Sequence, residues 1–223
     1  MSETFSPRNK VLSLIACVMT VILGLTAFAY KANYEGSVVS CFREMTVDGT
    51  LFTCLVAIII GIQRIRELCA RQDLPSRPCY FLHLSAAVTE ELILLVVLIG
   101  SLPFFPDHPV FLRYDMINMH VLLPLITMTT FVLFSQYPGK LRPHDRLNGL
   151  IFIICYAVIM ISLILLGVIP ESKIPYSFLN VRHCAPWYLL LAFVVLFGNS
   201  IAVSWWMTRA NCRAASRRTA VAS

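Results

Sequence analysis

Long apolar stretches alternate with short polar segments along the whole chain. Six of these stretches are about as long as the roughly 20 residues that a helix needs to cross a bilayer. They cover residues 11–30, 46–65, 81–102, 116–136, 147–169 and 187–208. A chain in hydrocarbon must satisfy its own backbone hydrogen bonds, and none of the stretches alternates as a barrel strand does. The pattern therefore predicts an all-α bundle of six transmembrane helices in one domain, residues 1–223.

The composition of the 223-residue chain agrees with a membrane protein. Hydrophobic residues make up 58% of it and charged residues 13%, and the mean hydropathy is +0.75. A soluble domain has about 25% charged residues. The net charge of +6 comes from short basic clusters between apolar runs, so we expect no nucleic-acid partner. Several of the eight cysteines lie inside apolar runs without metal-site spacing, which indicates small apolar packing residues or isolated thiols.

Lysine and arginine are distributed unequally between the two sides of such a bundle. With six spans, the two termini share one side with the second-to-third and fourth-to-fifth connections, and 13 of the 18 basic residues lie there. The positive-inside rule therefore places both termini in the cytoplasm. Short loops favour a bacterial plasma membrane, with the endoplasmic reticulum as the eukaryotic alternative. The first span could also be a cleavable signal peptide, but residues 11–30 exceed a usual signal core.

Polar side chains inside apolar spans need either a partner or a function. In the second span Thr46, Thr50 and Thr53 fall on one helical face, where threonines often bond their own helix or a neighbour. In the fourth span His120 lies one turn before Pro124, and a lone histidine there is most often a packing residue. Both spans run inward from the outer face, so Thr46 and His120 are predicted at similar depth near that face. This depth permits a hydroxyl nucleophile and its base to meet.

Two adjacent carboxylates, Glu90 and Glu91, lie near the middle of the third span. An ionised carboxylate there is unfavourable unless it is paired, hydrated or protonated. Neighbouring helical positions point about 100° apart, so at most one of the two faces a given cavity. Either a proton or substrate site or a hydrogen bond to another helix would explain them.

The outer loops contain carboxylates and histidines that are potential metal ligands. They are Asp107, His108, Asp115, Glu171 and His183. Their spacing does not match that of a metal site, so we expect neither a metal nor another cofactor.

Three short segments resemble the six-span membrane proteins similar to androgen-induced protein, which have many bacterial relatives. Residues 41–46 (CFREMT) resemble the aromatic-rich lead into a threonine at the head of the second span. Residues 120–124 (HVLLP) resemble the family's His-x-x-x-Pro at the head of the fourth span. Residues 175–179 (PYSFL), with Trp187, are similar to its Tyr/Pro/Phe signature before the last span. The likeness follows the order of the spans over almost the whole chain.

The resemblance implies a specific activity. Animal members of that family hydrolyse fatty acid esters of hydroxy fatty acids with a threonine nucleophile and a histidine, and the matching residues here are Thr46 and His120. The first hypothesis is accordingly an intramembrane hydrolase of a lipid ester, in which Asn118 or Thr50 could stabilise the oxyanion. One alternative is a noncatalytic membrane scaffold or lipid-binding protein. Another is a small proton-coupled transporter that uses Glu90 or Glu91.

Overall fold

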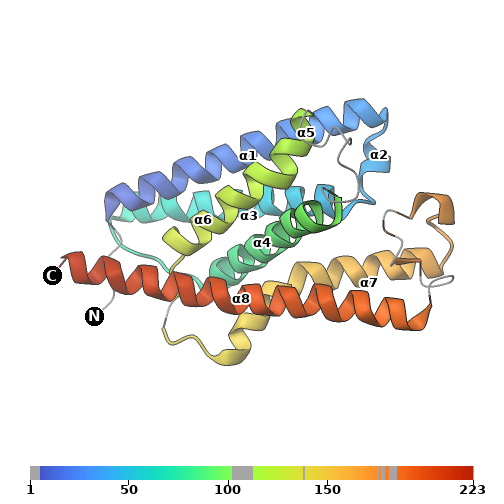
Figure 1. Cartoon of the computed structure of the whole chain (residues 1–223). Coiled ribbons are helices and arrows are strands. Elements are labelled where there is room, and N and C mark those ends of the chain that lie inside the picture. Colours follow the sequence, from blue (N-terminus) through green and yellow to red (C-terminus); the bar gives the residue numbers. More distant parts are fainter. Residues whose placement is uncertain are drawn as a thin grey trace.

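The computed structural model describes residues 6–101, 113–137, 139–174, 176, 179–180 and 185–222, which are mostly helical and contain no strand (Figure 1). The long helices are α1 (Pro7–Glu35), α3 (Met45–Ala70), α4 (Arg77–Leu95), α6 (Leu123–Phe134), α7 (Ile151–Leu165) and α8 (Pro186–Ala222). The short elements are α2 (Val38–Cys41), α5 (Tyr114–Ile117), the π-helical turns η1 (Val96–Ser101) and η3 (Asn118–Leu122), and the 3₁₀ turns η4 (Pro143–Leu150) and η5 (Glu171–Lys173).

Six helices in the described part of the chain are long and apolar enough to cross a membrane. With the short turns that continue them, they run over Pro7–Glu35, Met45–Ala70, Arg77–Leu98, Tyr114–Phe134, Pro143–Leu165 and Pro186–Arg217. The predicted all-α fold with six apolar helices is therefore confirmed. In Figure 1 the start of α1 and the end of α8 lie at the same end of the bundle, as an even number of spans requires.

Local chemistry explains where the helices begin and end. The Ser6 side chain accepts a hydrogen bond from the backbone N–H of Asn9 and so caps the start of α1. Pro7 occupies the first turn of this helix. The same helix ends at Gly36, whose φ of 65° is a left-handed conformation that favours glycine. α7 ends at Leu165, earlier than the predicted residue 169, because Gly167 turns the chain with a φ of 74°.

Helix α4 lies at the centre of the bundle. It packs against α3, α6, α7 and α8, and all of its residues 83–90 are buried. Small side chains at Ser85, Ala86 and Ala87 allow the neighbouring backbones to approach closely. Large apolar side chains from four helices, including Leu84, Phe131, Ile153 and Met207, fill the main core around it.

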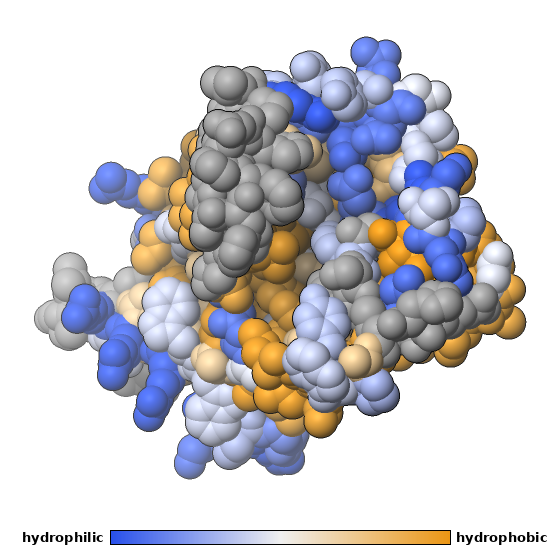
Figure 2. Space-filling model, turned by 45° about the vertical axis from the view of Figure 1, so that its right-hand side comes forward, coloured by the Kyte–Doolittle hydropathy of each residue, from blue (hydrophilic) through white to orange (hydrophobic). Residues whose placement is uncertain are grey.

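The outward faces of the peripheral helices carry many exposed apolar side chains. Examples are Val11, Ile15 and Ile22 on α1, Val158 and Ile159 on α7, and Leu190 and Val194 on α8. Figure 2 shows such residues, in orange, on the outside of the molecule. An apolar exterior of this extent fits contact with hydrocarbon rather than with water.

Candidate active site

Thr46 lies in the first turn of α3, at the end of the bundle opposite the chain termini (Figure 1). We call this end the far end. The carbonyl of Glu44 starts the helix by accepting the backbone N–H groups of Val47 and Asp48, at 3.0 and 3.2 Å. The first amides of a helix, here those of Met45 and Thr46, have no acceptor within their own helix. Thr46 itself is buried, and its hydroxyl is held on a fixed backbone.

His120 lies in the π-helical turn η3, between α5 and α6. In this turn the N–H of Leu123 bonds the carbonyl of Asn118, five residues earlier. Pro124 follows at the start of α6 and has no N–H to donate. π-helical turns inside α-helices occur frequently at functional sites. Here the turn directs the imidazole of His120 toward α3.

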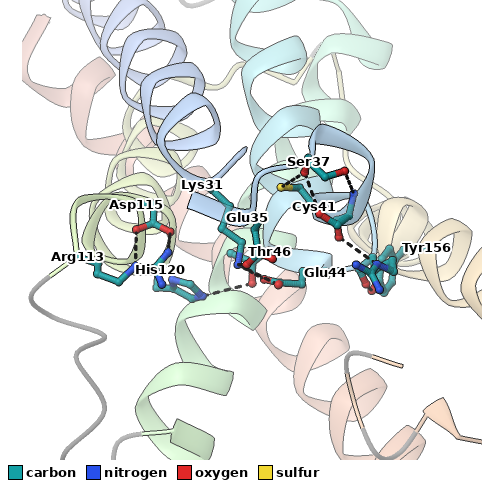
Figure 3. Close-up of polar contacts among 12 residues, drawn as sticks. Lys31, Glu35, Ser37, Cys41, Glu44, Thr46, Arg113, Asp115, His120 and Tyr156 are labelled. Carbon is teal, nitrogen blue, oxygen red and sulfur yellow. Dashed lines mark hydrogen bonds and ion pairs between the residues drawn. The ribbon is translucent and has the colours of Figure 1, made fainter. Parts of the chain in front are cut away.

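The structure brings Thr46 and His120 into contact, as Figure 3 shows. His120 Nε2 lies 3.4 Å from Thr46 Oγ1, and His120 Nδ1 lies 3.0 Å from the carbonyl oxygen of Met116. A carbonyl oxygen can only accept, so Nδ1 carries the proton of the neutral ring. The lone pair of Nε2 therefore faces the Thr46 hydroxyl, which is the orientation that a general base requires.

Charged side chains surround the pair at the far end (Figure 3). Lys31 of α1 lies 2.9 Å from a carboxylate oxygen of Glu44 and 3.3 Å from one of Glu35. Arg113 pairs with Asp115 at 2.7 Å, just before η3. Lys31 and Asp115 are both buried, so these ion pairs fix the end of α1 and the start of the fourth span.

An apolar cavity lies beside Thr46 and is lined by α3, α4, α7 and α8. The space between its walls, including the part that opens to the exterior, is about 620 Å³. Its apolar walls include Leu92 of α4, Ile153 of α7, and Phe193 and Phe197 of α8. Figure 2 shows a recess with apolar residues, in orange, on the side of the molecule that faces the viewer. The walls therefore present an apolar surface next to the Thr46 hydroxyl.

Tyr176, in the connection between α7 and α8, also lines this cavity. Its side chain lies in the cavity wall beside Met45 and Thr46. Burial raises the pKa of Tyr176 to about 12, so the phenol is protonated at neutral pH. Tyr176 is not among the site residues expected from the sequence, in which it belongs to the segment 175–179 that carries part of the family resemblance.

Asn118 and Thr50, the two residues expected as oxyanion donors, make other contacts. The side-chain amide of Asn118 donates a 2.7 Å hydrogen bond to the carbonyl of Tyr114 in its own helix. Thr50 lies one turn deeper than Thr46 and is fully buried, and its hydroxyl has no hydrogen-bond partner within the described residues. Neither side chain is hydrogen-bonded to Thr46 in the part of the chain that the structure describes.

Glu90 and Glu91 point in different directions. Glu90 is fully buried beside Thr53 of α3, and neither of its carboxylate oxygens has a hydrogen-bond partner of normal geometry within the described residues. Glu91 accepts a 3.0 Å hydrogen bond from the side-chain amide of Asn199 of α8. Glu90 is therefore the carboxylate that faces the interior of the bundle.

Within the described residues, no cluster of three or more His, Cys, Asp or Glu side chains could hold a metal ion. Asp107, His108 and His183, considered above as potential ligands, lie outside those residues.

Comparison of the chain with models of known families, with curated proteins and with solved structures finds no match. The fold defines the class of the protein as a helical, multi-pass membrane protein. Its far end combines a hydroxyl, an imidazole that can accept the hydroxyl proton, and an adjacent apolar cavity. This arrangement can activate an alcohol as a nucleophile.

Proposed function

We propose that this membrane protein hydrolyses a lipid ester, with Thr46 as the nucleophile and His120 as the general base. The observation that carries the proposal is the lone pair of His120 Nε2, which faces the Thr46 hydroxyl at 3.4 Å. A threonine hydroxyl is a weak nucleophile until a neighbouring base takes its proton. The carbonyl of Met116 holds the ring in the required tautomer, as a carboxylate does in many Ser–His pairs.

The reaction proceeds in two halves. Thr46 Oγ1 forms a bond to the ester carbonyl carbon while its proton moves to His120 Nε2, and the carbonyl π electrons move onto the carbonyl oxygen. When the tetrahedral intermediate collapses, the bond to the leaving alkoxy group breaks, and His120 returns the proton to it as an alcohol. Water then attacks the acyl-threonine with His120 again as the base, which releases the fatty acid and restores the hydroxyl.

The cavity supports a substrate with a long acyl chain. Its walls are almost entirely apolar, and Thr46 lies in its lining, so a chain in the cavity would bring an ester carbonyl to the hydroxyl. The exterior of the bundle is apolar as well, and a lipid could therefore arrive from the membrane. The resemblance to the androgen-induced protein family, whose animal members hydrolyse fatty acid esters of hydroxy fatty acids, supports the same class of substrate.

The proposal includes an orientation in the membrane. With 13 of the 18 basic residues on the side of the termini, the positive-inside rule puts that side in the cytoplasm. The far end, with Thr46 and His120, then lies at the outer surface.

The apolar cavity also favours a second candidate function, in which the protein binds a lipid and catalyses no reaction.

Labelling with a long-chain fluorophosphonate tests the proposal and separates the two functions. In the purified protein we expect a covalent adduct that mass spectrometry locates on Thr46, and release of fatty acid from a long-chain lipid ester. A protein that binds the lipid ester but forms no adduct and releases no fatty acid would be the lipid-binding protein of the second candidate.

A further inference from the structure

Arg146 lies in η4, which begins the fifth span at the end of the bundle that holds the start of α1 and the end of α8. We call this end the near end. The guanidinium of Arg146 lies over the indole of Trp205 of α8, with Cζ 4.0 Å from the ring centroid. The hydroxyl of Ser204 donates a hydrogen bond to the carbonyl of Arg146. Both the backbone and the side chain of this arginine are therefore fixed against α8.

The protein does not compensate the charge of Arg146. Its Nε atom is buried and has no hydrogen-bond partner within the described residues, and its guanidinium forms no ion pair with any of them. The adjacent carboxylate of Asp145 instead accepts hydrogen bonds from the Tyr137 hydroxyl and the backbone N–H of Arg142, at 3.0 and 2.8 Å. A buried nitrogen of a charged group is unfavourable without an acceptor, which indicates a ligand from outside the chain.

A second unpaired cation lies one helical turn from Trp205. Arg209 follows Trp205 by four residues on α8, so the two side chains leave the same face of the helix. Arg209 is exposed and has no ion-pair partner in the part of the chain that the structure describes. A guanidinium group donates in a planar fork that matches the oxygens of a phosphate. Arg146 and Arg209 thus offer two such forks beside one indole.

Aromatic side chains indicate the depth of these groups in the membrane. Trp205 and Trp206 are both exposed on α8, and tryptophan is enriched where hydrocarbon meets the lipid headgroups. Further into the bundle the exposed side chains are apolar, for example Ile201 one turn earlier on α8 and Ile151 at the start of α7. The two arginines therefore lie at the level of the lipid phosphates, next to a surface that fits acyl chains.

We propose that Arg146, Trp205 and Arg209 form a binding site for the phosphate of an anionic phospholipid in the near-end leaflet. The two guanidinium groups donate hydrogen bonds to the phosphate oxygens, and the acyl chains lie along the apolar side of α8. The site selects a lipid with a net negative charge, because the choline group of a zwitterionic lipid offsets the charge of its own phosphate. In the orientation proposed above this leaflet is the cytoplasmic one, whose surface is negative. The inference does not depend on the proposed hydrolysis.

Native mass spectrometry of the purified protein tests the site, by titration with phosphatidylglycerol and with phosphatidylcholine of the same acyl chains. The parent should bind phosphatidylglycerol more tightly. Arg209→Gln should weaken this binding about fivefold and Arg146→Gln/Arg209→Gln about 25-fold, with no change for phosphatidylcholine. Arg146 also packs on Trp205, whereas the side chain of Arg209 is exposed, so the single variant tests the site without disturbing that contact.

The matched control is Arg8→Gln/Arg66→Gln. It removes two exposed arginines of α1 and α3 at the same end of the bundle and changes the net charge by the same amount. This variant should keep the phosphatidylglycerol affinity of the parent. Arg146→Lys keeps the charge and loses the planar fork, so it should weaken binding less than Arg146→Gln does. Inorganic phosphate at the concentration of the lipid should not displace it, because it lacks acyl chains.

Three results would overturn the site. The parent could bind the two lipids equally, or Arg209→Gln and the Arg146→Gln/Arg209→Gln protein could keep the phosphatidylglycerol affinity of the parent. An equal loss in the Arg8→Gln/Arg66→Gln protein would show that the net charge of the near end, and not this site, attracts the lipid. Displacement by inorganic phosphate would show that the arginines bind free phosphate rather than a lipid.

Discussion

His120 Nε2 lies 3.4 Å from Thr46 Oγ1, although the two residues are 74 positions apart in the chain. Their contact requires that α3 and the fourth span begin at the same depth and that the π-helical turn η3 turns the imidazole toward α3. The hydrogen bond from His120 Nδ1 to Met116 then leaves only one ring nitrogen free to act as a base.

The first prediction concerns this pair. Thr46→Ala and His120→Ala should each reduce fluorophosphonate labelling and lipid-ester hydrolysis to the background level, because covalent chemistry needs both the hydroxyl and its base. Thr46→Ser keeps a hydroxyl and should retain part of both activities. Each variant should elute from size-exclusion chromatography in detergent as the parent does.

Thr53→Ala is the matched control for the Thr46 variant. Thr53 lies two turns deeper on the same face of α3, is buried, and has no hydrogen-bond partner of normal geometry within the described residues. Its loss should leave labelling intact. If the parent is labelled and Thr46→Ala is labelled equally well, Thr46 is not the nucleophile.

The second prediction concerns the orientation in the membrane. In a variant without native cysteines, single cysteines introduced at Ser2 and Ser223 should react only after the membrane is permeabilised. A cysteine at Lys173 should react with an impermeant maleimide from outside, because η5 follows α7 at the far end. Reaction of both terminal cysteines from outside would reverse the topology and place Thr46 and His120 at the cytoplasmic surface.

The six helices and the similar depth of Thr46 and His120 follow from features that are local in the sequence, whereas the contact between the two side chains depends on how α3 and the fourth span pack. Hydropathy marks each span, and the position of a residue in its span sets its depth in the bilayer. The place of Tyr176 in the same cavity wall as Thr46 does not follow, because it depends on how the connection between α7 and α8 folds back toward α3. The cavity is likewise a gap between four helices, and hydropathy contains no information about such gaps.

The difference between Glu90 and Glu91 was also beyond the sequence. The two positions differ by about 100° around the helix, so the choice depends on the rotation of α4 about its own axis. Both residues look alike in a hydropathy plot. In the structure Glu90 faces α3, whereas Glu91 is bonded to Asn199 of α8.

The third prediction uses this difference. Glu91→Leu should lower the free energy of unfolding by about 1 kcal/mol, because it leaves the Asn199 amide without its acceptor. Glu90→Leu should be neutral or stabilising, since it replaces a buried carboxyl whose oxygens have no hydrogen-bond partner of normal geometry in the described residues. Thermal unfolding in detergent measures both, with the isosteric Glu90→Gln for comparison. A Glu90→Leu protein that melts well below the parent would indicate a partner for this carboxyl.

The last prediction concerns the contact between η4 and its neighbours. A Cβ atom on Gly149 would lie 2.6 Å from Ser204 Oγ and 3.0 Å from Val88 Cγ2, so neither alanine nor any larger residue fits without movement. Ser204 cannot turn away freely, because its hydroxyl donates a 2.5 Å hydrogen bond to the carbonyl of Arg146. Gly149→Ala should therefore lower the free energy of unfolding by about 1–3 kcal/mol.

Gly198 on α8 provides the control, because a Cβ atom there meets no neighbouring atom within 4 Å. Gly198→Ala should leave the melting temperature unchanged or raise it slightly, since alanine favours a helix by up to about 1 kcal/mol over glycine. The double variant Gly149→Ala/Ser204→Gly removes the side chain that the new methyl group would meet, and it should recover part of the lost stability. If Gly149→Ala and Gly198→Ala melt alike, η4 and α8 do not pack as closely as the structure has them.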